Sequence, residues 1–295
     1  MANDNIEQAL QNIIATNYIR GIGPKKLLTI LRAEPLNCTD SEFLKTYFKI
    51  PYQKWNIALE NAKKCLDMCY ELGIAPVLYS TKKYPSLLAQ IDDAPVILYT
   101  KGNIEAMQSR SIAIIGSRDA HPISIEVANK FAQFFVGKGA SVVSGLALGC
   151  DTSAHMGTLE AGGKTVAVLA HGLDMIYPAT NKKLASEIID KGGVLVSEYS
   201  PLTKPFRTYF VQRDRIQSGL SNASLVVQTK KGAGTMHTAN FCIEQKRLLA
   251  TCYPLWPEIS ELFTGNLELI DTGQAIPIKS KDDLEKIWNM VCIST

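Results

Sequence analysis

Three residues that directly follow an apolar run have the chemistry to bind an anion. Gly116, Ser117 and Arg118 come after Ile112–Ile115. Glycine lets the backbone approach a ligand closely, a serine hydroxyl donates a hydrogen bond, and a guanidinium binds two phosphate oxygens at once. The four apolar, mostly β-branched residues predict a strand that is buried on both faces. We therefore expect an anion site at the carboxyl end of this strand, where parallel sheets bind their ligands.

A second glycine-rich corner follows about one strand–helix unit later. Ser141–Val143 predicts a strand, and Ser144–Asp151 predicts the loop after it, with Gly145 and Gly149 inside the loop. The carboxyl ends of neighbouring parallel strands lie at the same edge of a sheet. We therefore expect the two loops to share one crevice, with Ser144, Gly145 and Gly149 contributing to phosphate binding.

The chain between residues 199 and 232 is basic, although the protein as a whole is nearly neutral. The formal net charge of the 295 residues is only +3. Within this segment a single acid, Asp214, stands against the cations Lys204, Arg207, Arg213, Arg215, Lys230 and Lys231. A local positive field beside glycine-rich loops favours a polyanion as the partner.

Aromatic residues alternate with these cations, as in grooves that bind single-stranded nucleic acid. They are Phe206, Tyr209 and Phe210. We expect Arg118 and Arg207 to hold phosphates, Phe210 to stack on a base, and the glycine loops to donate backbone N–H groups. The simpler alternatives are that the aromatic rings pack against the sheet and that the arginines form a solvated face.

Alternating strand and helix patterns from residue 73 onward predict one large α/β domain, 73–295. Thr165–Leu169 is an example of its short apolar strands. Such alternation predicts a mostly parallel sheet with helices on both faces. Asp151 is expected to cap the helix 151–161, and a short helix is expected over 213–220.

Residues 1–72 predict a small all-α domain. Helical periods cover 6–17 and 55–72. The turn 21–23, with two glycines between two predicted helices, resembles a helix-hairpin-helix, in which backbone N–H groups can hold a phosphate. An ordinary glycine turn between helices is the alternative.

The composition excludes several other classes of protein. No window has the ~18 uninterrupted apolar residues that a membrane helix needs, and the N-terminus lacks the pattern of a signal peptide. Seven cysteines and four histidines show no zinc-site spacing. We therefore expect reduced thiols, a cytoplasmic location, and no metal or cofactor. His155 is expected to be structural, because no nucleophile or second base accompanies it.

Several motifs occur in order and extend this interpretation. They are Gly116-Ser117-Arg118, Ser144-Gly145-Leu146-Ala147-x-Gly149-x-Asp151-x-x-Ala154-His155, Gly163-Lys164-Thr165, Gly172-Leu173-Asp174-x-x-Tyr177-Pro178-x-x-Asn181, Ser197-Glu198, Phe210-x-x-Arg213-x-Arg215 and Gly234-Thr235-x-x-Thr238-Ala239. This series resembles the DNA-processing protein A (DprA, also called Smf) family, from about Tyr84 to Asp283. The small N-terminal helical domain, similar to a SAM or helix-hairpin-helix domain, is also like that family's.

The resemblance implies an extended Rossmann-like domain that binds single-stranded DNA, protects incoming strands and helps load the RecA recombinase in natural transformation. It also implies a homodimer without a catalytic step. Some members end in a winged helix, and we expect none here because the chain stops too early to hold one. The DNA- or phosphate-binding residues that we predict are Gly116, Ser117, Arg118, Ser144, Gly145, Gly149, Lys164, Arg207, Phe210, Arg213, Arg215, Lys231, Gly234 and Thr235.

The chain departs from the family pattern and is expected to be a divergent member. The family usually has Phe-Pro-x-Arg-Asn-Arg, whereas this chain has Val211 in place of the proline and Asp214 in place of the asparagine. A carboxylate there either repels anions or pairs with Arg213 or Arg215 and orients them. Ala233 replaces a serine, so one hydroxyl is lost.

Two competing functions use the same type of fold. Nucleotide hydrolases of the cytokinin-activating, lysine-decarboxylase-like family carry Gly-Gly-x-Gly-Thr-x-x-Glu, and this chain has Thr238 at the position of the catalytic glutamate. Threonine cannot replace that carboxylate, so we expect no enzyme activity. A nucleotide-binding module without catalysis is the other alternative.

Overall fold

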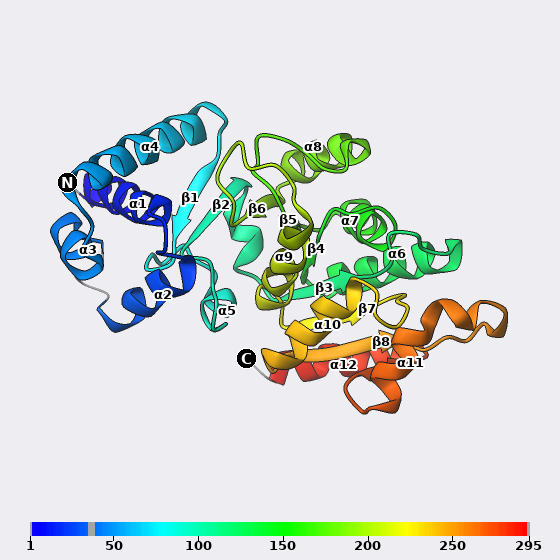
Figure 1. The fold of residues 1–295 in the computed structure, drawn as a ribbon. Helices are drawn as coiled ribbons and strands as arrows, with labels where there is room; N and C mark the ends of the chain where they lie inside the picture. The colour runs from blue at the N-terminus through cyan, green and yellow to red at the C-terminus, as the bar shows by residue number, and fades with distance from the viewer. Residues whose placement is uncertain (1, 35–38, 294–295) are drawn as a thin grey trace.

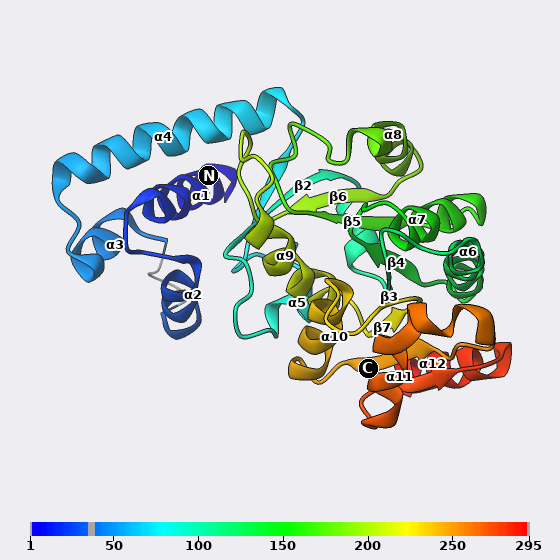
Figure 2. The ribbon, with the colours of Figure 1, turned by 45° about the vertical axis from the view of Figure 1, so that its right-hand side comes forward.

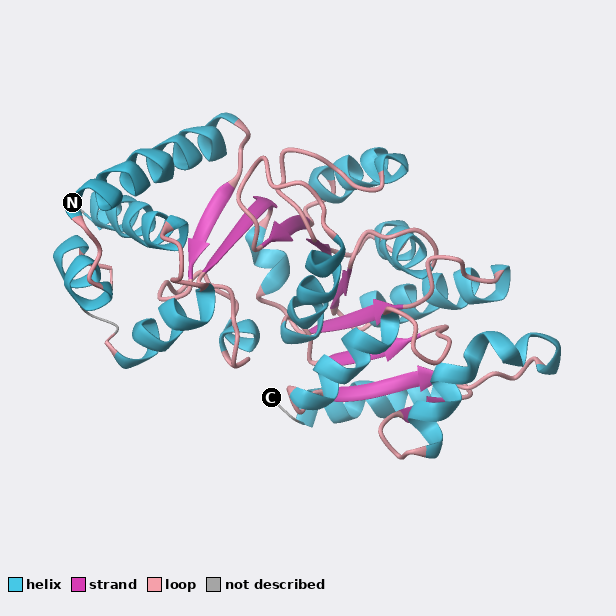
Figure 3. Cartoon of the chain, in the orientation of Figure 1, coloured by secondary structure: helices cyan, strands magenta, loops and turns pink. Residues whose placement is uncertain are grey.

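The computed structural model describes residues 2–34 and 39–293, so Cys38, one of the seven cysteines, lies outside the described residues. Within them, one nine-stranded sheet runs through the larger part of the protein (Figures 1 and 3). The strands lie in the order β1-β2-β6-β5-β4-β3-β7-β8-β9. Their bounds are β1 Ala75–Leu78, β2 Ile97–Gly102, β3 Ser111–Ile115, β4 Ser141–Ser144, β5 Thr165–Leu169, β6 Val194–Ser197, β7 Ala223–Val226, β8 Leu248–Cys252 and β9 Ile276–Ile278.

The seven strands β6-β5-β4-β3-β7-β8-β9 are parallel to one another, whereas β2 pairs in the antiparallel sense with both β6 and the edge strand β1. Every residue of β3, β4, β5 and β6 is buried. Continuous apolar runs form such strands because helices cover both of their faces. The predicted α/β fold with a mostly parallel sheet is confirmed.

Helices cover both faces of the sheet (Figure 2). Three of them share a buried apolar cluster on one face: α6 Pro122–Gly137, α7 Cys150–Glu160 and α12 Lys281–Ile293. On the other face lie α9 Arg207–Gly219, α10 Thr235–Glu244 and α11 Thr264–Asp271. The remaining helical segments of this part of the chain are α5 Ser86–Ala89, α8 Lys182–Asp190, η1 Ile104–Met107, η2 Ala179–Asn181 and η3 Pro257–Phe263.

The starts of two helices near the predicted site differ from the prediction. The helix predicted over 213–220 begins at Arg207, because the chain holds no proline between Pro205 and the end of α9. Asp151 does not cap α7, whose N-cap is Gly149. The Asp151 carboxylate lies in the first turn and bonds to the preceding loop, where it has more N–H donors to accept from.

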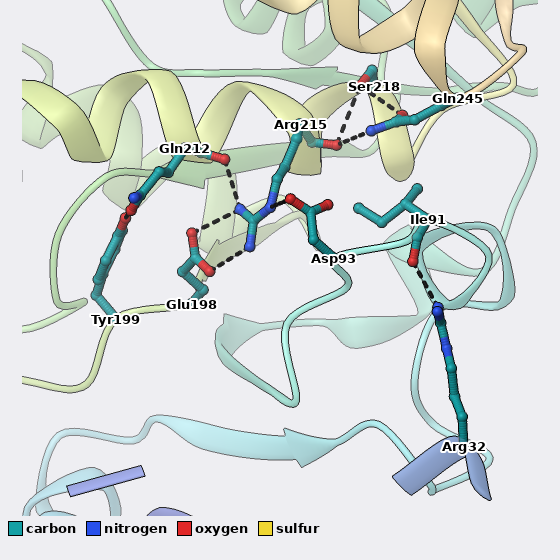
Figure 4. Close-up of polar contacts among 9 residues, drawn as sticks. All are labelled: Arg32, Ile91, Asp93, Glu198, Tyr199, Gln212, Arg215, Ser218 and Gln245. Atoms are coloured by element: carbon teal, nitrogen blue, oxygen red, sulfur yellow. Dashed lines mark hydrogen bonds and ion pairs between the residues drawn. The ribbon is translucent and has the colours of Figure 1, made fainter. Parts of the chain in front are cut away.

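The N-terminal helices pack against the antiparallel edge of the sheet. Their bounds are α1 Ala2–Tyr18, α2 Pro24–Ala33, α3 Ser41–Phe48 and α4 Tyr52–Glu71. Trp55 of α4 is buried in an apolar cluster that continues into the sheet. Arg32 of α2 donates to the carbonyl oxygen of Ala89 at 3.1 Å and to that of Ile91 at 2.7 Å, and Figure 4 shows the second contact. The predicted boundary at residue 72 falls between α4 and β1, and the division into domains 1–72 and 73–295 stays a prediction.

Two kinds of feature are absent from residues 2–34 and 39–293. No helix there is both long enough and apolar enough to cross a membrane. No group of three or more histidine, cysteine or acidic side chains is placed to hold a metal ion.

Candidate functional site

A cavity of about 520 Å³ opens at the carboxyl ends of β3 and β7. The loop after β3, the first turns of α9 and the loop that leads into α10 form its walls. The predicted residues that line it are Gly116, Ser117, Arg118, Arg207, Phe210, Arg213, Gly234 and Thr235. Those outside its lining are Ser144, Gly145, Gly149, Lys164, Arg215 and Lys231.

The two glycine corners pack against each other, as the sequence predicted. Cys150 N–H donates to the carbonyl oxygen of Ser117 at 3.2 Å. A Cβ on Gly116 would lie 2.5 Å from the Cys150 sulfur. A Cβ on Gly149, whose φ is +76°, would lie 2.3 Å from the Ser117 oxygen. Both glycines are therefore needed for close packing of the loops, and Gly149 is a structural residue rather than a ligand contact.

The loop after β4 directs its polar groups inward, which corrects the prediction for Ser144 and Gly145. Ser144 Oγ is buried and donates to the carbonyl oxygen of Ile114 at 2.7 Å. The Gly145 and Ala147 N–H groups donate to Asp151 Oδ2 at 3.1 and 3.4 Å. An acidic side chain of the protein thus occupies the position that we predicted for a phosphate. Burial raises the pKa of Asp151.

Arg213 lines the cavity, and its guanidinium contacts other groups of the protein. Its Nη1 donates to the carbonyl oxygens of Gly145 and Val168 at 2.8 and 2.6 Å. Its Nε lies 3.2 Å from Asp214 Oδ1, and the side chain is buried. Arg213 therefore ties the ends of β4 and β5 to α9. We predicted Arg213 as a DNA- or phosphate-binding residue; it does line the cavity, but its buried guanidinium contacts the protein itself.

Arg215 is not among the residues that line the cavity, and its guanidinium lies in a polar cluster with Glu198 and Asp93 (Figure 4). Its Nη1 and Nη2 donate to the two carboxylate oxygens of Glu198 at 2.8 and 2.7 Å, and its Nε lies 3.1 Å from Asp93 Oδ2. The Arg215 carbonyl accepts from Gln245 of α10 at 3.0 Å. This arginine holds α9 against the chain after β6, so its predicted DNA contact is also wrong.

The two predicted lysines lie outside the cavity. Lys164 precedes β5 and is exposed at the amino end of the parallel strands, which is the opposite edge of the sheet. Lys231 Nζ lies 2.9 Å from Glu268 Oε1 and stays largely exposed. Because β5 is parallel to its neighbours, Lys164 lies at the edge of the sheet opposite the cavity. Lys231 precedes the lining residue Gly232, and its charge is paired with Glu268.

The exposed cations of the cavity are Arg118 and Arg207. The ion pairs described in this region involve Arg213 and Arg215 instead. The Arg118 guanidinium lies 5.0 Å from the centre of the Phe210 ring, at cation–π distance. Phe210 also approaches the Tyr177 ring, with 5.8 Å between centroids. The cavity thus combines open positive charge with a half-buried aromatic face.

Sequence reasoning missed Tyr177 as a member of this aromatic face. It is 46 % exposed and follows β5 in the chain. Loops after parallel strands gather at one edge, so the loop between β5 and α8 could have been added to the site on that ground. Phe206, which the sequence did single out, is 62 % exposed and its ring lies 5.8 Å from that of Tyr209.

Asp214 is one of three aspartates that line the cavity, with Asp119 and Asp151, and it pairs with Arg213 rather than with Arg215. Burial raises its pKa to about 6, with Arg213 and Arg118 opposing the rise and Asp151 adding to it. A carboxyl group with a raised pKa therefore lies within the electrostatic field of the open Arg118.

His155 is buried below the crevice, as expected of a structural residue. Its Nδ1 lies 2.7 Å from Thr165 Oγ1. Burial and the charge of Arg213 lower its pKa to about 3, so the ring is neutral at physiological pH. It joins α7 to β5 and does not reach the cavity.

Comparisons with known proteins match most of the chain. A family model described as DNA recombination-mediator protein A matches residues 75–289. The DNA processing protein DprA of Bacillus subtilis is 34% identical over 235 residues, which are 77% of this chain and 78% of that protein. DprA of Streptococcus pneumoniae is 38% identical over 164 residues, which are 56% of this chain and 57% of that protein.

Solved structures give the same result. The X-ray structure of Streptococcus pneumoniae DprA superposes with a TM-score of 0.69 at 26% identity, covering 97% of this chain and 96% of that one. Helicobacter pylori DNA processing protein A, whose structure is described in terms of its single-stranded DNA binding mode, gives a TM-score of 0.66 at 26% identity. That match covers 73% of this chain and 96% of the other.

Proposed function

The chain belongs to the DNA recombination-mediator protein A (DprA/Smf) family, and from this premise we propose that it binds single-stranded DNA in the cavity at the ends of β3 and β7. The observation that carries the proposal is the pairing of two exposed arginines, Arg118 and Arg207, with the half-buried ring of Phe210. Grooves that bind single strands combine positive charge along the backbone with aromatic faces for the bases.

The phosphates contact the two arginines, and the bases contact the aromatic face. Arg118 and Arg207 approach the cavity from different elements, the loop after β3 and the start of α9, so they hold successive phosphates. A base stacks on Phe210, with Tyr177 beside it. Gly234 and Thr235 bring the N-terminus of α10 to the wall, where N–H groups and the helix dipole favour an anion.

The resemblance to the family supports a proposal for the place of this binding in the cell. The chain protects incoming strands and helps to load the RecA recombinase in natural transformation, acting in the cytoplasm as a homodimer and without catalysis. Catalysis by N-glycosidic hydrolysis finds no support, because the buried Thr238 stands where the related hydrolases have a glutamate.

A mononucleotide is the alternative ligand. The cavity volume of about 520 Å³ is within the range of small-molecule pockets, and Asp214 makes the wall less positive than a wholly basic groove. A nucleotide-binding module would saturate with a mononucleotide and would not gain affinity with polymer length.

The test is a fluorescence-anisotropy titration of labelled oligo-dT at two salt concentrations, with duplex DNA and dTMP as competitors. We expect salt-sensitive binding that neither competitor displaces efficiently, because counterion release makes backbone contacts depend on salt. R118E should abolish most of the affinity, whereas K183E, at a lysine that is 90% exposed on α8, should not. Efficient displacement by dTMP would favour the nucleotide-binding module, and unchanged affinity of R118E would contradict the proposed site.

A further inference from the structure

A second groove, of about 570 Å³, lies at the β9 edge of the sheet and shares no lining residue with the first cavity. Helix α6, the chain after β8 and the chain between β9 and α12 form its walls. Its apolar lining includes Phe131, Phe134, Tyr253, Leu255, Trp256 and Leu284, and three lysines, Lys130, Lys279 and Lys281, complete it. We call it the lysine-rimmed groove.

The walls of the lysine-rimmed groove are fixed by packing between α6 and α12. Phe135 and Trp288 bring their ring centroids to 6.2 Å, and Lys138 Nζ lies 2.8 Å from Glu285 Oε2. The floor consists of side chains that are buried, Phe131 and Leu284. Its apolar surface is therefore built into the fold.

The rim of the groove is positively charged. No aspartate or glutamate is among the residues that line it. Lys279 Nζ lies 4.5 Å from the centre of the Tyr253 ring. Lys130 pairs with Glu126 on the outer side of α6, and both side chains are more than 60% exposed. Exposed pairs of this kind are weak, so all three lysines remain able to attract an anionic partner.

The groove is poorly suited to phosphate, which separates it from the proposed DNA site. The N–H groups of Lys279 and Ser280, at the start of α12, donate to Asp283 Oδ2 at 3.0 and 3.1 Å. These bonds, with Lys286, lower the pKa of Asp283 to about 2, so the carboxylate keeps its place at neutral pH. No arginine lines the groove. The amides and guanidinium groups that bind phosphates are therefore missing or occupied.

We propose that the lysine-rimmed groove docks an acidic, amphipathic peptide segment of a partner protein. Apolar side chains of the segment enter between α6 and Trp256, where the exposed Leu255 extends the contact. Acidic side chains of the segment pair with Lys279 and Lys281 at the rim. Apolar anchors supply affinity, and the charged rim supplies specificity and orientation.

The test uses a fluorescein-labelled peptide, Glu-Asp-Leu-Phe-Asp-Glu-Leu-Leu-Asp, titrated with the full-length protein. We expect saturable binding to the wild type, and weaker binding by about tenfold or more in the double variant K279E/K281E, because two attractions become repulsions. L255D should weaken binding similarly by placing a carboxylate at the apolar rim. K183E is the matched control on α8 and should bind as the wild type does. A peptide with lysine at every acidic position should not bind.

Absence of saturable binding to the wild type, or equal binding by K279E/K281E, overturns the proposal. Displacement of the peptide by oligo-dT also overturns it, since the groove would then belong to the DNA path. The outcome is independent of the proposed function: R118E tests the DNA cavity and should leave peptide binding unchanged.

Discussion

Replacing Asp214 by asparagine is expected to tighten the binding of single-stranded DNA at neutral pH. Asp214 lines the cavity between the buried Arg213 and the open Arg118. When the carboxylate is ionised it opposes the field of both arginines. Asparagine keeps an oxygen beside Arg213 Nε and removes the negative charge, so the change is electrostatic and nearly isosteric.

Coulomb's law sets the size of the effect. If a phosphate held by Arg118 is taken to be about 8 Å from the Asp214 carboxylate, the two unit charges repel by about 2 kcal/mol at an effective dielectric constant of about 20. Screening by salt and water in an open cavity lowers this repulsion to about 1 kcal/mol, which corresponds to about a fivefold change in affinity.

The same substitution should stabilise the fold at neutral pH. Burial raises the pKa of Asp214 from 3.8 to about 6 in the folded protein. A raised carboxyl pKa means that the ionised form is disfavoured by folding, so this group's contribution to stability is largest below about pH 4 and is lost as the pH rises towards 6. The rise corresponds to about 3 kcal/mol, at about 1.4 kcal/mol for each pKa unit. D214N should recover up to that amount near pH 7.5 and nothing near pH 4, as measured by urea denaturation.

The decisive assay is oligo-dT anisotropy on both sides of pH 6. Wild-type affinity should rise as the pH falls, because protonation removes the Asp214 charge, and D214N should show a smaller rise. Other groups of the cavity are the same in both proteins, so the difference between them isolates Asp214. D271N, at an exposed aspartate outside the cavity, is the matched control. If D214N binds no tighter than the wild type at neutral pH and follows the same pH curve, the electrostatic reasoning is refuted.

Three further substitutions test other parts of the account. F210A should lose about 1–3 kcal/mol of affinity for oligo-dT with little change in salt dependence, since it removes stacking and no phosphate contact; a changed salt slope with intact affinity would argue against stacking. R215M should lower the free energy of unfolding by about 3–5 kcal/mol, because it leaves the buried Glu198 without its partner, and a thermal melt like that of the wild type would show that the cluster is not structural. G149A should cost at least about 2 kcal/mol in urea denaturation, since φ is +76° and the new Cβ would meet the Ser117 oxygen; an unchanged midpoint would mean that the loops can separate freely.

The features that the sequence predicted well are local ones. A buried strand followed at once by Gly116 and Ser117 needs only nearest neighbours to be recognised, and the sheet places this corner at the cavity. The alternation of strands and helices likewise fixed the fold class, because each element's pattern lies within its own residues. The same local reasoning would have excluded Lys164, which stands at the start of a parallel strand rather than at its end.

The errors concern arginines whose partners are distant in the chain. Arg213 donates to the carbonyl of Gly145 and Arg215 donates to Glu198, and both contacts depend on the tertiary fold. A cation in a basic stretch looks the same in sequence whether it faces solvent or a buried carboxylate. The sequence pattern of α9 does not separate the two kinds of arginine, because the exposed Arg207, which lines the cavity, lies on the same helix as Arg213 and Arg215.

The central claim is that Arg118 and Arg207 hold phosphates of a single strand in this cavity. The most direct test is the salt dependence of oligo-dT affinity for the wild type and for the double variant R118A/R207A. Single strands lose about 0.7 in the slope of log K against log salt for each phosphate contact, so the account predicts a slope shallower by about 1.4 in the variant, with weaker binding at every salt concentration. An unchanged slope and affinity would show that the strand binds elsewhere on the protein.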